Sequence, residues 1–191
     1  KCIVAVESIV PAFVKQLEEN GVYYIDNETE MLQLTKTVLN HDMKMVRKME
    51  GKSAMDILEE AGIHPNRPVR LVVVRTFAKH PLVLEECLMP VVPLVAVADF
   101  EEALETALFT EQGYRHTAMV HSQCIDRLSK AAKIMNTTVF IKNGSSLAGI
   151  GLNGEEMASF TIANVTGEGI TTARDFACKR SCTLTSGFSL R

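Results

Sequence analysis

Residues 100–154 alternate between helical and strand patterns, and this alternation is the feature that most constrains the fold. Apolar side chains in residues 100–108 recur at helical spacing, whereas residues 117–120 and 137–141 are short β-prone runs bounded by turn residues. Strands that alternate with helices predict a mostly parallel sheet covered on both faces. The sequence therefore indicates an α/β fold with three layers, helices on either side of a sheet.

The rest of the chain continues the same pattern. We expect strands at residues 2–6, 22–25 and 71–74, and helices at residues 10–19 and 54–60, capped by Ser8 and Ser53. Helical patterns also run to about residue 38 and again to about Met49. Residues 82–98 are expected to be extended because Pro90 and Pro93 fall inside them. Short strands are expected at residues 160–163 and 182–185, and a helical turn near residues 171–176. No repeat or change in composition marks a boundary, so we expect one domain over residues 1–191.

Composition excludes several classes of function. The 191 residues carry a net charge of -3, which gives no electrostatic reason to expect nucleic acid or an anionic membrane as a partner. Five scattered cysteines are typical of free thiols in a reducing compartment, so we expect a cytoplasmic protein. The longest apolar run, residues 88–97, is too short for a membrane span. Because the chain starts inside a predicted strand and without methionine, we expect a fragment or a processed product.

The glycine-rich loop at residues 143–154 follows a predicted strand, and ligands of parallel sheets bind beyond the carboxyl ends of strands. Gly149, Gly151 and Gly154 match the spacing of a dinucleotide fingerprint. However, several residues separate Gly149 from the strand, and two glutamates follow Gly154, where a pyrophosphate would be repelled. A close-packed pocket loop is therefore the favoured interpretation.

Other reactive residues have simpler explanations. Cys178 and Cys182 have too few neighbouring ligands for zinc, and His116 and His121 should lie on opposite faces of a strand, so no metal site is expected. His121 and Ser122 lack an orienting acid for a catalytic triad. Cys2 is expected to be a small buried hydrophobic residue.

Glu85 and Glu86 are harder to explain structurally. They lead into an apolar segment, where a carboxylate without a partner is costly to bury. A functional acid and a solvent-exposed strand start are both consistent with this pattern.

Several motifs together resemble one known family. The segments 85–91 and 99–103 resemble the aldehyde dehydrogenase signature in which an acidic pair precedes a Pro-Val strand and a helix. Residues 116–123, 136–144, 160–163, 166–174 and 180–184 resemble the CoA-acylating branch, the acetaldehyde and propionaldehyde dehydrogenases often found in bacterial microcompartments. This resemblance covers essentially the whole chain.

The resemblance implies that the chain is the carboxy-terminal catalytic domain of such an enzyme. The amino-terminal NAD-binding domain would be absent, and residues 181–191 would form an oligomerisation strand and tail. Lys1 is similar to the lysine just after the family's nucleophilic cysteine, so the nucleophile is expected upstream of Lys1 and no catalytic residue is expected within the chain.

The chemistry implied by the resemblance is oxidation of a short-chain aldehyde to an acyl-CoA, with NAD as hydride acceptor and CoA as co-substrate, through a cysteine thioester. By position, Glu86 matches the acid that contacts the nicotinamide ribose, and Leu88 matches the apolar residue beside the nicotinamide. Asn143, Ser145, Ser146 and Leu147 match the aldehyde tunnel, and His116 and Thr117 stand where acyl or CoA selection is expected.

Two functions follow as expectations. The first is an acylating aldehyde dehydrogenase, cytoplasmic or enclosed in a microcompartment and homo-oligomeric, of which this fragment alone is inactive. The alternative is a non-enzymatic binding or assembly module on the same scaffold, which would retain the ability to pair sheet edges through residues 182–185.

Overall fold

The computed structural model describes residues 1–154, 158–159, 170–181, 183 and 185. The chain divides into two compact units, residues 1–113 and 114–191, where the sequence predicted one domain. The boundary falls inside the stretch of alternating helix and strand, because the strands on either side of it pair in different sheets. Each unit is described by itself below.

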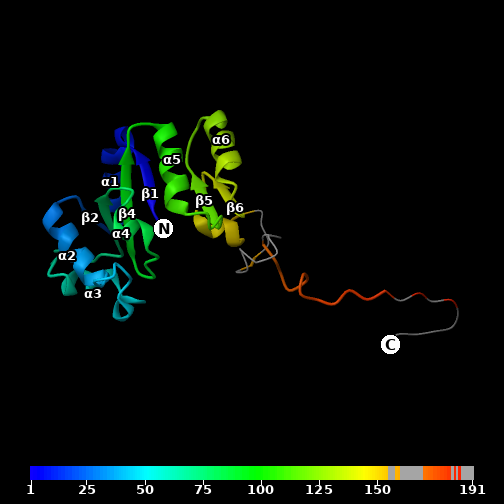
Figure 1. Ribbon diagram of the computed structural model, residues 1–191, viewed down its shortest axis with the longest axis horizontal. Coiled ribbons are helices and arrows are strands. Elements are labelled where there is room, and N and C mark those ends of the chain that lie inside the picture. Colours follow the sequence, from blue (N-terminus) through cyan, green and yellow to red (C-terminus); the bar gives the residue numbers. More distant parts are fainter. Residues whose placement is uncertain (155–157, 160–169, 182, 184, 186–191) are drawn as a thin grey trace. The chain divides into compact units, whose positions relative to one another are not determined.

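The first unit is built on a four-stranded parallel sheet with the strand order β1-β4-β3-β2 (Figure 1). Its strands are β1 (Ile3–Val6), β2 (Val22–Ile25), β3 (Leu71–Thr76) and β4 (Val91–Val97). Its helices are α1 (Val10–Glu19), α2 (Glu28–Val38), α3 (Ala54–Glu60), α4 (Pro81–Leu84) and α5 (Phe100–Glu111).

Helices cover both faces of this sheet. Side chains of α1 pack with Ala5, Val73 and Leu94 on one face. On the other face, α2 and α3 pack on Val72 and Val74, while α4 and α5 contribute to a smaller cluster around residues 95 and 97 of β4. Because successive side chains of a strand point to opposite faces, both layers are filled. The predicted three-layer α/β arrangement is confirmed in this unit.

The free edge of β2 carries a side-chain contact. The Arg67 guanidinium donates a hydrogen bond from Nη2 to the Val22 carbonyl at 3.1 Å. Since β2 pairs with β3 on its other side, this contact lies at the outer strand of the sheet.

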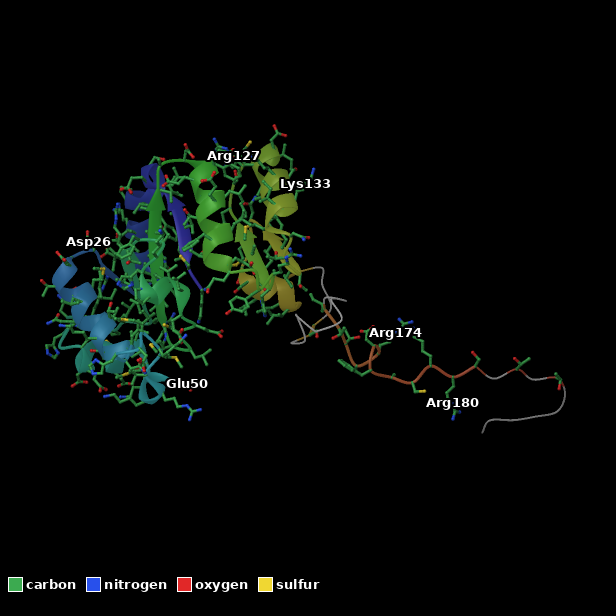
Figure 2. All side chains as sticks on the ribbon, viewed as in Figure 1. Asp26, Glu50, Arg127, Lys133, Arg174 and Arg180 are labelled. Atoms are coloured by element: carbon green, nitrogen blue, oxygen red, sulfur yellow. The ribbon has the colours of Figure 1, made fainter. Side chains whose placement is uncertain are left out.

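The second unit contains two parallel strands, β5 (Thr117–Val120) and β6 (Val139–Lys142), joined by α6 (Ile125–Met135). Figure 2 shows Arg127 and Lys133 on α6, whose buried residues are Leu128, Ala131 and Met135. A 3₁₀ turn, Ser146–Ile150, follows β6. The strand predicted at residues 160–163 lies outside the described residues, as do two of the four residues, 182 and 184, of the strand predicted at residues 182–185.

Three local predictions were wrong. Ser8 does not cap α1; it lies in a 3₁₀ turn, Glu7–Ile9, that leads directly into the helix. The helical pattern near Met49 forms a single 3₁₀ turn, Arg47–Met49. Residues 82–98 are not continuously extended, because α4 begins at Pro81, which supplies the first helical position where a missing N–H costs nothing.

Candidate active site

Residues 85–90 connect α4 to β4 and carry the acidic pair singled out in the sequence. Along this segment burial alternates: Cys87 and Met89 are each 4% exposed and lie in the core, whereas Leu88 is 47% exposed and Glu86 is also exposed. An extended backbone turns alternate side chains to opposite sides. Glu86 and Leu88 are therefore presented together on the outer side of the segment.

Glu85 has a different environment from Glu86. Its Oε2 accepts a hydrogen bond from Lys44 Nζ at 2.8 Å, and its Oε1 accepts one from the Met45 backbone N–H at 3.5 Å. The Lys44 ammonium lowers the pKa of the Glu85 carboxyl, because a hydrogen bond to a cation favours the ionised form. One member of the pair thus has a structural partner.

The loop at residues 40–51 also contacts the backbone of residues 85–90. The Leu88 carbonyl accepts a hydrogen bond from the Gly51 N–H at 3.2 Å, and the Leu88 N–H lies 3.2 Å from Met45 Sδ. Glu50, which Figure 2 labels, belongs to the same loop. Glu86 and Leu88 precede β4 in the chain, so they lie before its amino end.

Sequence reasoning missed this loop. Lys44 and Met45 are about 40 positions from Glu85 in the chain, and neither belongs to a recognisable motif. The single local signal is Asn40, whose Oδ1 accepts hydrogen bonds from the Asp42 and Lys44 N–H groups and shapes the turn.

In the second unit, the carboxyl ends of β5 and β6 are joined by Asn143. Its side chain accepts a hydrogen bond from the Ser122 N–H at 2.8 Å and donates one to the Ser122 carbonyl at 2.9 Å. Asn143 has φ 52°, a left-handed conformation that asparagine adopts more readily than most residues. The predicted site residue Asn143 therefore fixes the start of the loop.

The rest of the predicted tunnel loop forms the 3₁₀ turn. Ser145 caps it by accepting a hydrogen bond from the Leu147 N–H at 3.3 Å, and Ser145, Ser146 and Leu147 are all exposed. The turn runs back along β6, because a Cβ added at Gly149 would lie 2.5 Å from Val139 Cγ1.

Gly149 and Gly154 allow close packing of the loop that follows β6. Gly149 lies inside the 3₁₀ turn and not directly after β6, as a dinucleotide fingerprint would require. A Cβ added at Gly154 would lie 2.3 Å from the Ala148 carbonyl oxygen. The favoured interpretation of a close-packed loop is confirmed for these two glycines.

His116 and Thr117 lie at the amino end of β5. His116 Nδ1 and Thr117 Oγ1 are 2.7 Å apart, and the imidazole is exposed. Thr117 pairs in register with Val139, and Val139 contacts the site of Gly149. The 3₁₀ turn Ser146–Ile150 thus reaches the amino end of β6, next to Thr117 on β5. Asn143 follows the carboxyl end of β6.

The four described cysteines are free thiols in two environments. Cys2 packs against the cluster of Val83, Val95 and Val97, and burial raises its pKa to about 11, which disfavours the thiolate. Burial also raises the pKa of Cys87. Cys124 and Cys178 are exposed. Cys182 lies outside the described residues.

Within the described part of the chain, no group of three or more histidine, cysteine, aspartate or glutamate residues could hold a metal ion. Also among these residues, no helix is long and apolar enough to cross a bilayer.

Comparison with known proteins shows similarity along the entire chain. The propanal dehydrogenase (CoA-propanoylating) of Salmonella typhimurium is 43% identical over 193 residues, which cover 100% of this chain and 41% of the relative. The homologues of this chain are CoA-acylating aldehyde dehydrogenases. No family model matches.

Solved structures agree with this result. An engineered glycolyl-CoA reductase with bound NADP+ and the Rhodopseudomonas palustris propionaldehyde dehydrogenase with bound propionyl-CoA are each 39% identical, with TM-scores of 0.89 over 96% of this chain and 42% and 41% of theirs. A propionaldehyde dehydrogenase from the Clostridium phytofermentans fucose utilisation bacterial microcompartment is 34% identical, with a TM-score of 0.87 over 100% of this chain and 44% of its own.

The chain spans about two-fifths of the length of the relatives it matches, 41% for the Salmonella protein. These alignments do not support the expectation that this segment is the carboxy-terminal part of such an enzyme.

Proposed function

We propose that this chain is a segment of a CoA-acylating aldehyde dehydrogenase that oxidises a short-chain aldehyde to an acyl-CoA. The observation that carries the proposal is the 43% identity to a CoA-propanoylating propanal dehydrogenase over all of the chain. In the intact enzyme, aldehyde, NAD and CoA would give acyl-CoA, NADH and a proton.

The segment at residues 85–88 suits a bound dinucleotide. The exposed Glu86 carboxylate can accept hydrogen bonds from a pair of ribose hydroxyls, and the exposed Leu88 side chain offers an apolar surface to a flat ring. When bound, NAD supplies the acceptor for the hydride that leaves the aldehyde carbon. The role of Glu86 is to orient the sugar, and that of Leu88 is to exclude water from one side of the ring.

Residues of the second unit are proposed to bind the substrates. Ser145, Ser146 and Leu147 are exposed on the turn that Asn143 anchors, so they can line the path of a small aldehyde. His116 is held by Thr117 through Nδ1, which leaves Nε2 to face an acyl or CoA group. We propose that these residues of the second unit select between acyl chains.

The nucleophile is proposed to be a cysteine other than the four described. Thiolate chemistry requires a lowered pKa and access, whereas Cys2 and Cys87 have raised pKa values. Cys124 and Cys178 are exposed. In the full-length enzyme, a tryptic peptide that carries the acyl thioester would identify it.

Cytoplasmic location, enclosure in a microcompartment and a homo-oligomeric state are part of the same proposal. The structural neighbour from a fucose utilisation microcompartment supports the second of these. Fluorescence of a tagged full-length protein, as microcompartment puncta or diffuse signal, tests it.

The experiment is a steady-state assay of the full-length protein with propionaldehyde, NAD and CoA. Acyl-CoA formation that requires CoA would support the proposal, whereas release of free propionate without CoA would contradict it. Glu86→Gln should raise the KM for NAD, and Glu59→Gln, an exposed glutamate on α3, serves as the matched control.

This chain alone is expected to be inactive in the same assay. NAD-dependent oxidation of propionaldehyde by the 191-residue chain would contradict that expectation. No specific observation favours the non-enzymatic assembly module, and two of the four residues of its proposed strand at residues 182–185 lie outside the described residues.

A further inference from the structure

The two neighbouring glutamates before β4 have different surroundings. Glu86 faces solvent, whereas Glu85 accepts hydrogen bonds from Lys44 Nζ at 2.8 Å and from the Met45 N–H at 3.5 Å. Both partners of Glu85 come from the loop at residues 40–51, which is remote in sequence. The contact therefore ties the start of the segment to a second piece of chain.

The end of the segment is tied to the same loop. The Gly51 N–H donates to the Leu88 carbonyl at 3.2 Å, and the Leu88 N–H approaches Met45 Sδ at 3.2 Å. Between these two attachments, Cys87 is buried in the core. With both ends held and Cys87 turned inward, the side chain of Glu86 has to point outward.

The upstream side of Glu85 is also fixed. The Glu85 N–H donates to the Pro81 carbonyl at 2.9 Å, which closes α4, and the Leu84 carbonyl accepts from Gln112 Nε2 at 2.9 Å. Glu85 is thus the residue at which the helix, the extended segment and the loop meet.

We infer that Glu85 is a positioning residue, which with Lys44 sets the orientation of Glu86 and Leu88 and so the affinity for the dinucleotide. This inference rests on the proposed function. It assigns the two acids separate tasks: Glu86 contacts the cofactor, and Glu85 holds the backbone that presents it. Lys44 lowers the pKa of the Glu85 carboxyl, so this carboxylate stays ionised to a lower pH than an unpartnered glutamate would.

The test is a charge swap in the full-length enzyme. Glu85→Lys and Lys44→Glu each place like charges together, so each should raise the KM for NAD by about two- to fivefold with little change in kcat. The double variant E85K/K44E restores opposite charges and should bring KM back toward the wild-type value. A residue that contacts the cofactor directly would not be rescued in this way.

A control ion pair is available in the same unit. Arg75 on β3 pairs with Glu7 at 2.8 Å, also near the surface but without a contact to the loop at residues 40–51 or to residues 85–88 among the interactions described. Swapping this pair should leave the KM for NAD unchanged. Glu85→Gln retains an acceptor for the Met45 N–H and should give a smaller rise in KM than Glu85→Lys.

Amide hydrogen exchange on the 191-residue chain provides a readout that does not depend on activity. Glu85→Lys should increase exchange at Met45, Gly51 and Leu88, and the double swap should reverse the increase. A raised KM that the double swap leaves unrescued would overturn the inference, as would unchanged exchange in Glu85→Lys. Either result leaves the proposed function standing, since that is tested by CoA-dependent activity of the wild-type enzyme; an inactive wild type would overturn both.

Discussion

His80 Nδ1 accepts a hydrogen bond from the Leu82 backbone N–H at 3.2 Å, so a buried imidazole caps α4. The ring stacks edge-on against Phe77, with centroids 5.3 Å apart. An Nδ1 that accepts a hydrogen bond cannot carry a proton. The cap therefore depends on the neutral form of His80.

This cap predicts a pH dependence of stability. Burial lowers the pKa of His80 below its ordinary value of 6.5, so the unfolded chain binds a proton more tightly than the folded one. The contribution is fully present above pH 6.5 and should be lost as pH falls through the folded pKa. Urea unfolding of the 191-residue chain between pH 5 and 8 measures it. His80→Asn, which can cap without titrating, should flatten this part of the profile, while His41→Gln, at an exposed histidine, should not.

Gly149→Ala should destabilise the second unit by about 1–3 kcal/mol, as expected for overpacking. The new methyl group would lie 2.5 Å from Val139 Cγ1 and 3.0 Å from Ile141 Cδ1, and neither branched side chain can rotate freely in the core. Gly144→Ala is the comparison: its new methyl group would lie 3.1 Å from Ile141 Cγ2, a tight contact that a shift of a few tenths of an ångström relieves, so it should cost less. Equal loss of unfolding free energy in the two variants would contradict this account.

Asn143→Ala should cost about 1–2 kcal/mol, since it removes two hydrogen bonds to Ser122. The left-handed backbone adds strain in this variant. Asn143→Gly removes the same bonds without the strain, so the difference between the two variants separates these causes. Hydrogen exchange of residues 117–120 and 139–142 reports the effect, and protection that survives in both variants would show that the Ser122 contacts do not hold the strand ends.

Thiol labelling should divide the described cysteines into two groups. Cys124 and Cys178 are exposed and should react with iodoacetamide at pH 8 well before Cys2, whose pKa of about 11 leaves little thiolate, and before the buried Cys87. Peptide mass spectrometry measures the order. Labelling in denaturant is the control, in which all should react alike. Early modification of Cys2 would contradict its packing against the cluster of Val83, Val95 and Val97.

Elements with a clear local signal at one end or the other were predicted well from sequence. The bounds of α1 and β2 match the prediction, because Asn20 and Gly21 end one and begin the other, with Gly21 at φ 83°. The helix α3 also matches, since Ser53 and Asp56 form a capping box that the sequence displays openly.

Contacts between distant residues escaped prediction. The partnership of Glu85 with Lys44 spans 41 positions and depends on how the loop at residues 40–51 folds, which no local pattern encodes. For the same reason the residue pattern left a functional acid and a solvent-exposed strand start both open, and it did not show which of the two acids has a structural partner. The short helix α4 was missed because four residues carry too little periodicity to outweigh the prolines around them.

The hydrogen bond from the Arg67 guanidinium to the Val22 carbonyl occupies a backbone acceptor on β2, the strand at one edge of the four-stranded sheet. An incoming strand that tried to pair with β2 would have to displace a charged donor before forming its own backbone hydrogen bonds there. Fibril-like stacking of the unit through this border is therefore disfavoured, which protects a short, valine-rich sheet from templating its own aggregation.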